Sequence, residues 1–137
     1  MVWVLAVFSV VYIGTHPNSQ EPEPVVPQPV TIEVKQADTF VAECTAYTAG
    51  YESTGKTPDN PAYGITASGR KVREGMIAAD TSVLPFGTKV WIEGLGVFVV
   101  EDTGGAIVGN RIDIYMDSLD EAVEFGRQSR KVIILER

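Results

Sequence analysis

Residues 111–116 carry the clearest pattern in the chain, because every second residue of the sequence RIDIYM is apolar. Successive side chains of an extended chain point to opposite faces, so this alternation predicts a strand with one buried face. The other face holds Asp113 between Arg111 and Tyr115. The strand therefore presents a carboxylate beside a cation and a phenol.

A second apolar run, FVV at residues 98–100, precedes this strand. The intervening residues include Gly104 and Gly105, so the stretch 98–116 predicts two strands joined through a tight connection with an exposed backbone. Asp102 lies where the first of these strands ends. A rigid scaffold often presents its chemical groups at such edges, which makes the carboxylates candidates for function. The alternative is a solvated carboxylate on a half-exposed strand.

The same kind of pattern predicts the remaining elements of a β-rich domain. Further strands are expected at residues 40–48, 76–80, 89–93 and 131–136. A turn at 94–96 predicts a hairpin, and Ser118 with Glu121 forms a capping box that opens a short helix ending near Arg127. Six strands, one helix and short turns indicate a small mixed β-barrel rather than a sandwich of regular hairpins.

Two details of the domain concern its cysteine and its longest loop. Cys44 falls on the apolar face of the strand 40–48 and is expected to be a small buried residue. Residues 48–64 are rich in Gly, Pro and Asn, and a loop of this length in a compact domain is usually functional or disordered. Tyr51 and Tyr63 could stack on sugar rings there, or could pack the loop onto the domain.

The first part of the chain has a different composition. Residues 2–13 are an almost unbroken apolar run, shorter than the roughly 20 residues of a spanning helix but within the roughly 7–15 of a secretory h-region. We therefore expect a signal peptide or short membrane anchor at 1–15, with a helix packed on the domain as the alternative. The following Pro-rich residues predict an extended linker over 16–37, with a possible short strand at 31–35. The folded domain is expected at 38–137.

Composition and charge exclude several classes of function. The net charge of −7 argues against nucleic acid, which requires basic patches on its partner. The chain has one cysteine, Cys44, and one histidine, His16, which lies in the linker. A zinc cluster, a disulfide framework, a Ser-His-Asp triad and a Cys-His pair all need more than this. We expect no metal and no cofactor, and any catalysis falls to carboxylates, hydroxyls, lysine or tyrosine.

A series of motifs runs in one order along residues 40–135. They are TAYT (45–48), ITASG (65–69), IAAD (77–80), LPFGTKVWIEGLG (84–96), VVEDTGGAIVGNRIDIYMDS (99–118) and an A-x-x-F-G-R helix (122–127). This order strongly resembles the 3D domain, a family named for three aspartates and related to the catalytic barrel of MltA-type lytic transglycosylases. The resemblance implies a six-stranded double-psi β-barrel that cleaves the glycan strand of peptidoglycan. The loop 48–64 is longer than in the most compact members.

The resemblance also implies which residues carry the chemistry. Its three aspartates correspond to Asp80, Asp102 and Asp113 here. We assign Asp113 the acid/base role because it lies within a strand beside Tyr115, whereas Asp102 and Asp80 are expected to tune it or contact substrate. Grouping carboxylates in a partly dry cleft raises one pKa, so that one group keeps its proton. Substrate contacts are expected from Tyr47, Thr66, Ser68, Gly104, Gly105, Arg111 and Tyr115.

The expected partner is a peptidoglycan glycan strand. The protein is expected outside the cytoplasm, as a secreted or membrane-anchored monomer. Any membrane tether would be formed by residues 2–13. The sequence leaves open whether cleavage yields an anhydro sugar or a hydrolytic reducing end, because both use the same residues. One alternative is a non-catalytic carbohydrate-binding barrel. Another is a dimeric aspartic protease, since 102–104 read Asp-Thr-Gly and 107–111 resemble a second protease element. A purely structural domain is the third.

Overall fold

The computed structural model describes Gly14 and residues 38–137. Apart from Gly14, the expected leader (1–15), the linker (16–37) with His16 and the possible strand at 31–35 lie outside the described residues. Residues 38–137 belong to one compact unit. In this part of the chain, no helix is both long enough and apolar enough to span a membrane.

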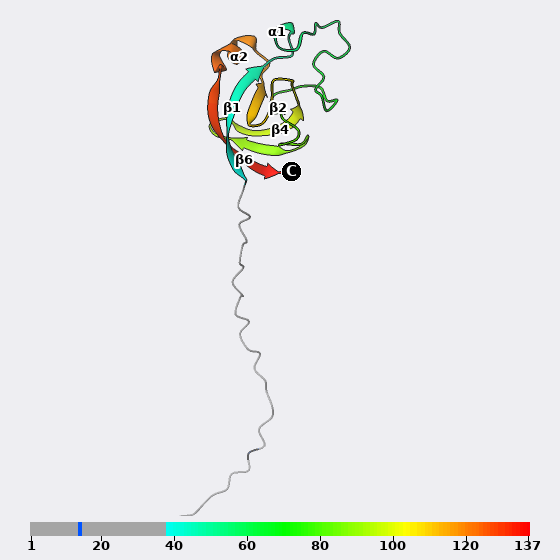
Figure 1. Cartoon of the computed structure of the whole chain (residues 1–137). Helices are drawn as coiled ribbons and strands as arrows, with labels where there is room; N and C mark the ends of the chain where they lie inside the picture. The colour runs from blue at the N-terminus through cyan, green and yellow to red at the C-terminus, as the bar shows by residue number, and fades with distance from the viewer. Residues whose placement is uncertain (1–13, 15–37) are drawn as a thin grey trace, which may run out of the picture. The chain divides into compact units, whose positions relative to one another are not determined.

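Six strands form one closed barrel, in the order β1-β5-β2-β4-β3-β6 (Figure 1). The strands are β1 (Thr39–Tyr47), β2 (Met76–Ala79), β3 (Lys89–Ile92), β4 (Gly96–Asp102), β5 (Arg111–Tyr115) and β6 (Gln128–Glu136). β1 runs parallel to β5 and β2 parallel to β4, while the other four neighbouring pairs are antiparallel. The predicted mainly-β class and closed six-stranded mixed barrel are confirmed.

β2 lies between β4 and β5, although these two strands are consecutive in the chain. Its four residues, MIAA, are all buried, and a strand covered on both faces is expected to be apolar throughout. The connection 103–110 therefore crosses from one side of β2 to the other instead of closing a hairpin. This crossover places two strands that are consecutive in the chain on the two sides of β2.

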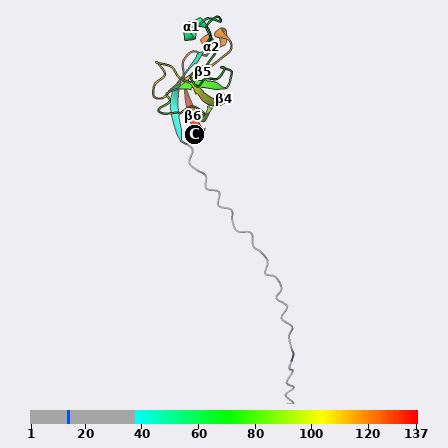
Figure 2. The ribbon, with the colours of Figure 1, turned by 90° about the vertical axis from the view of Figure 1, so that its right-hand side faces the viewer.

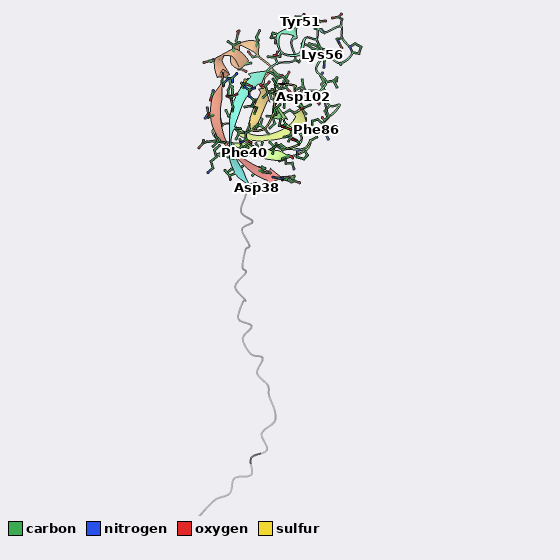
Figure 3. All side chains as sticks on the ribbon, in the orientation of Figure 1. Asp38, Phe40, Tyr51, Lys56, Phe86 and Asp102 are labelled. Atoms are coloured by element: carbon green, nitrogen blue, oxygen red, sulfur yellow. The ribbon has the colours of Figure 1, made fainter. Side chains whose placement is uncertain are left out.

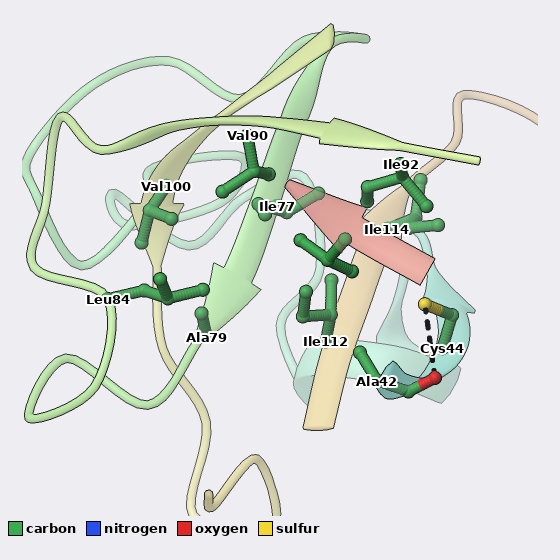
Figure 4. Close-up of a cluster of buried hydrophobic side chains, with 11 residues drawn as sticks. Ala42, Cys44, Ile77, Ala79, Leu84, Val90, Ile92, Val100, Ile112 and Ile114 are labelled. Carbon is green, nitrogen blue, oxygen red and sulfur yellow. Dashed lines mark hydrogen bonds between the residues drawn. The ribbon is translucent and has the colours of Figure 1, made fainter. Parts of the chain in front are cut away.

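The core is filled by aliphatic side chains that point inward from the strands (Figure 4). Ile112 and Ile114 of β5 are 1% and 2% exposed, as the predicted alternation requires, whereas Tyr115 on the opposite face of the strand is also buried, at 8% exposed. Cys44 is fully buried, as predicted, and burial raises the pKa of its thiol to about 11. A thiol in this environment is an apolar core residue rather than a nucleophile.

The hairpin and the second helix also follow the sequence signals. β3 and β4 pair antiparallel around a turn in which Gly94 and Gly96 have φ of 76° and 106°, a region that favours glycine. Helix α2 (Leu119–Phe125) begins after Ser118, whose Oγ accepts a hydrogen bond from the Glu121 backbone N–H at 3.3 Å. The N-terminal half of the predicted capping box is thus present.

The loop after β1 contains a helix of one turn that the sequence patterns did not predict, α1 (Tyr51–Thr54). Two views related by 90° place α1 and α2 at the same end of the barrel, away from the C-terminus (Figures 1 and 2). The Thr48 hydroxyl donates to the Glu52 carboxylate, which ties α1 to the end of β1. The loop is therefore anchored where the strand leaves the barrel.

Candidate active site

Two of the three predicted aspartates flank one small residue of β2. Ala78 is the register partner of Asp113 on β5 and, after a shift in register, of Asp102 on β4. Neighbouring strands are about 4.8 Å apart, so the backbones of the two aspartates are separated by about 10 Å across β2. Register partners lie on the same face of a sheet, and both carboxylates therefore rise above the Ala78 methyl group.

Asp102 and Asp113 line a pocket of about 420 Å³ on the outer face of the barrel. Its floor includes Ala78, and one wall comes from the loop after β1, including Lys56. The opposite wall comes from Gly104 and Ile107 of the crossover connection. In Figure 3, Asp102 lies below the loop that carries Tyr51 and Lys56. The pocket therefore combines a strand floor with two loop walls.

Asp102 is held by three donors. Its Oδ2 accepts from the Tyr47 hydroxyl at 2.9 Å, and its Oδ1 accepts from the backbone N–H groups of Ala67 and Thr103, each at 2.9 Å. Donors from three separate segments leave the carboxylate one orientation. Asp102 therefore joins β1, β4 and the loop before β2 at the edge of the pocket.

Asp113 is half-buried and has a different environment. Its Oδ1 accepts a hydrogen bond from the Thr45 hydroxyl at 2.8 Å, because the parallel register of β1 and β5 sets these residues side by side. Burial raises the pKa of the Asp113 carboxyl, the Thr45 hydrogen bond opposes this rise, and the negative charge of Asp102 adds to it. The pKa of the group that the sequence assigned the acid role is thus raised, mainly by burial.

Tyr47 and Tyr115 form an aromatic pair beside these carboxylates. Their ring centroids are 5.5 Å apart with planes at 72°, an edge-to-face contact. Burial, followed by the charge of Asp102, raises the pKa of the Tyr47 phenol far above its ordinary value, so this hydroxyl remains a donor. Burial also raises the pKa of Tyr115, to about 12. Tyr47 lines the pocket, whereas Tyr115 lies outside it.

Asp80, the third predicted aspartate, is not among the residues that line this pocket. Its Oδ2 accepts from the Gly109 backbone N–H at 2.8 Å, and its Oδ1 accepts from the backbone N–H and hydroxyl of Ser82 at 3.0 and 2.6 Å. The Gly109 hydrogen bond is the main cause that lowers the pKa of Asp80, followed by the bonds from Ser82. Asp80 thus holds the crossover connection that supplies Gly104 and Ile107 to the pocket.

The remaining predicted contact residues divide between the pocket and its surroundings. Thr66 and Gly104 line the pocket, whereas Ser68, Gly105 and Arg111 do not. Ser68 donates to Glu101 at 2.6 Å. Arg111 pairs with Glu43 at 2.7 Å and donates to the Ala106 carbonyl at 3.1 Å. Both of these side chains are therefore engaged in holding the barrel and its connection together.

Three residues of the site had no signal strong enough to single them out in the sequence. Thr45 and Ala78 belong to the motifs TAYT and IAAD. Only the strand register shows that Thr45 lies beside Asp113 and that Ala78 lies between Asp102 and Asp113. Lys56 lies in the long loop, and it is the one cation among the described residues that line the pocket. Within residues 38–137, no three His, Cys, Asp or Glu side chains gather as a metal site would require.

We expect two substitutions to move the pKa of Asp113 in opposite directions. Thr45→Val removes a hydrogen bond that favours the charged carboxylate, so the pKa should rise. Asp102→Asn removes a nearby negative charge, so the pKa should fall. Carbon-detected NMR titration of the side-chain carboxyl measures both shifts. Shifts of the same sign in the two variants would contradict this account of the site.

Part of the chain matches a known protein family, and the chain is similar in sequence to two curated proteins. Residues 75–136 match the model of the 3D domain. The chain is 38% identical over 95 residues to the cell wall-binding protein YocH of Bacillus subtilis, an alignment that covers 66% of this chain and 30% of YocH. It is 36% identical over 105 residues to the putative cell wall shaping protein YabE of the same species, covering 66% and 26%. The chain therefore spans less than a third of either relative.

Similar solved structures include two lytic transglycosylases. MltA from Escherichia coli, in a crystal with bound chitohexaose, has a TM-score of 0.46 at 24% identity, with 51% of this chain and 27% of that chain covered. LtgG of Burkholderia pseudomallei has a TM-score of 0.46 at 23% identity, with 59% and 28% covered. The sequence match rests on the segment that contains both strands of the paired aspartates, Asp102 and Asp113. In residues 75–136, the chain carries a domain of the 3D family.

Proposed function

We propose that this protein acts on peptidoglycan at the cell envelope and cleaves its glycan strand. The observation that carries the proposal is the pair of unlike carboxylates, Asp113 half-buried with a raised pKa and Asp102 held by three donors. Acid-assisted glycosidic cleavage requires a carboxyl group that can keep its proton, and a partly buried carboxyl with a raised pKa meets that requirement. Support for the wall as substrate comes from relatives described as cell wall-binding and cell wall shaping.

In the proposed reaction, Asp113 acts first as acid and then as base. Its carboxyl proton passes to the oxygen of the β-1,4 glycosidic bond, which breaks so that one sugar departs as a neutral alcohol and positive charge develops at the anomeric carbon of the ring that remains. The resulting carboxylate then takes the proton of the sugar's own 6-hydroxyl, whose oxygen closes on the ring carbon and gives an anhydro end. Addition of water instead of this hydroxyl gives a hydrolytic reducing end with the same residues.

Asp102 and Tyr47 are proposed to stabilise the charge that develops. Asp102 lies on the other side of Ala78 from Asp113, with its orientation held by the Tyr47 hydroxyl at 2.9 Å. A charge fixed in advance lowers the energy of an oxocarbenium-like transition state without needing to reorganise. Ala78 leaves room between the two carboxylates for a ring, because its side chain is a single methyl group.

A non-catalytic carbohydrate-binding domain is the second candidate. The observation that favours it is the description of one relative as a binding protein. The pocket and its aromatic and hydroxyl groups suit either function. The two candidates differ in whether glycosidic bonds are broken, which a product analysis measures directly.

The test is digestion of purified peptidoglycan by the 137-residue chain, with soluble products analysed by mass spectrometry. New glycan ends are expected, and ends lighter by one water than hydrolytic ends support the lytic route. Ala78→Leu is the matched variant, because its larger side chain fills the floor between the carboxylates without removing either of them. It should bind and cleave glycan at least about tenfold more weakly. Binding by the unchanged chain without any new ends would overturn the catalytic proposal in favour of the binding domain.

A further inference from the structure

A second and larger hollow lies between helix α2 and the β3–β4 hairpin. It encloses about 660 Å³, and we refer to it as the acidic groove. Four half-buried apolar side chains that pack against the core also line this groove: Leu95, Phe98, Met116 and Phe125. A mostly apolar cavity of several hundred Å³ with a few polar groups is the usual form of a small-ligand site.

The polar groups of the acidic groove are of one sign. Glu74, Glu121 and Glu124 line it, and its other polar side chains, Gln128 and the Tyr115 phenol, are uncharged. No lysine or arginine is among its lining residues, and none of the three glutamates is in an ion pair within residues 38–137. All three are exposed, so their charges remain available to a ligand. The groove thus offers apolar contact and uncompensated negative charge together.

The acidic groove adjoins the carboxylate pocket through the tyrosine pair. Tyr115 lines the groove, Tyr47 lines the pocket, and their rings are in edge-to-face contact at 5.5 Å. The same strand supplies both sites, because β5 carries Asp113 into the pocket and Tyr115 into the groove. The two sites are therefore neighbours, separated by the Tyr47–Tyr115 ring pair, and a ligand that fills the pocket would carry its branch over these two rings to the groove.

We propose that the acidic groove binds the short peptide branches of the glycan strand, through a free side-chain ammonium and the apolar atoms beside it. This inference rests on the proposed function, and it goes beyond that function by assigning a peptide site to the same chain. Wall peptides carry carboxylates of their own, and the segment that matches the groove is the one that combines alanine methyl groups with a diamino acid whose free amino group is positively charged. Three carboxylates around an apolar floor match this combination, whereas an acidic or a neutral polar ligand would leave their charges unbalanced.

Binding is tested with N-acetyl-Ala-Lys-Ala-amide, using NMR spectra of the 137-residue chain. The signals of Phe98, Met116 and Phe125 should shift, and those of Asp102 and Thr66 should not. The same peptide with its lysine acetylated is the matched ligand, because it keeps the shape and loses only the charge. Its affinity should be about 3- to 30-fold lower, as expected for losing the attraction between one ammonium and the exposed carboxylates at the edge of the groove.

The matched protein variants remove charge inside and outside the groove. Glu121→Gln with Glu124→Gln should weaken binding of the lysine peptide by about 2- to 20-fold. Asp120→Asn removes a charge from the same helix at a residue that does not line the groove, and it should leave the affinity unchanged. An equal loss in both variants would show that only the overall negative charge attracts the peptide, which overturns the site.

A second measurement compares peptide-bearing glycan strands with strands stripped of their peptides. The unchanged chain should prefer the peptide-bearing strands, and the Glu121→Gln, Glu124→Gln variant should lose that preference. Binding of the lysine peptide without any such preference would assign the groove to a basic segment of another protein and overturn the proposal. Groove signals that shift with protein concentration, with no response to the peptide, would assign it to a second copy of the chain. Failure of the proposed function gives a different result. In that case the lysine peptide still binds to the groove, but neither kind of strand is cleaved.

Discussion

Asp113→Asn is expected to lose about 10²–10⁴-fold in the rate of glycan cleavage, the usual contribution of general acid–base help. Asparagine has the size and shape of aspartate, and it can still accept the hydrogen bond that Thr45 donates at 2.8 Å. It cannot supply a proton to the glycosidic oxygen or take one from the 6-hydroxyl. The loss should therefore appear in kcat, measured as the release of new glycan ends, with little change in stability.

The pH dependence of cleavage gives a second readout of the same group. Activity should fall as the pH rises through the pKa of Asp113, because the acid must be protonated, and burial moves that fall to higher pH than for a solvated aspartate. Asp113→Glu should keep a falling limb, and Asp113→Asn should have none. Glycan binding by Asp113→Asn should persist, since a neutral polymer does not need the charge. Cleavage by Asp113→Asn at near the unchanged rate would contradict the acid role of Asp113 and leave Asp102 as the remaining carboxylate of the pocket.

Ile112→Ala is expected to lower the free energy of unfolding by about 2–5 kcal/mol. Ile112 is 1% exposed and belongs to the core cluster, on the opposite face of β5 from Asp113. Its truncation leaves a cavity in a barrel whose total stability is expected to be only about 5–15 kcal/mol. The melting temperature should fall by more than about 8 °C, measured by circular dichroism or calorimetry.

Two substitutions serve as controls for this stability prediction. Ile112→Val removes one methylene group and should cost about 0.5–1.5 kcal/mol. Val41→Ala, at a strand residue that is 63% exposed, should stay within about 0.5 kcal/mol of the unchanged chain. If Ile112→Ala were as mild as Val41→Ala, β5 would not be anchored by the core. The core would then not hold Asp113 in a fixed position through its strand.

Local patterns predicted most of the strands because each pattern follows from one local requirement, such as burial of one strand face, a turn with positive φ or a helix N-cap. The alternation at 111–116 predicted that Ile112 and Ile114 are buried while Asp113 faces away from the core, and the structure confirms it. The predicted hairpin has glycines where its turn requires positive φ. Helix α2 begins at its predicted N-cap, Ser118. These features depend on residues within a few positions of one another.

The site depended on information that no local pattern contains. Ala78 separates Asp102 from Asp113 because β2 lies between β4 and β5. This strand order is determined by how the whole barrel closes. From the sequence, Asp80 was expected to tune Asp113 or contact substrate, as Asp102 was. The oxygens of Asp80 instead bond Gly109 and Ser82, away from the pocket lining. The family match begins at residue 75, so it also omits β1, which brings Thr45 and Tyr47 to the aspartates.

The sequence by itself determined the class of the fold, the buried faces of its strands and the residue types available for chemistry. These follow from hydrophobic periodicity and composition, which act over a turn or a strand at a time. Only the tertiary structure decided which carboxylates share a pocket, that the pKa of Asp113 is raised, and that three glutamates with no ion pair among residues 38–137 line an apolar groove. Burial and charge proximity are sums over residues that are distant in the chain, so they exist only once the barrel has closed.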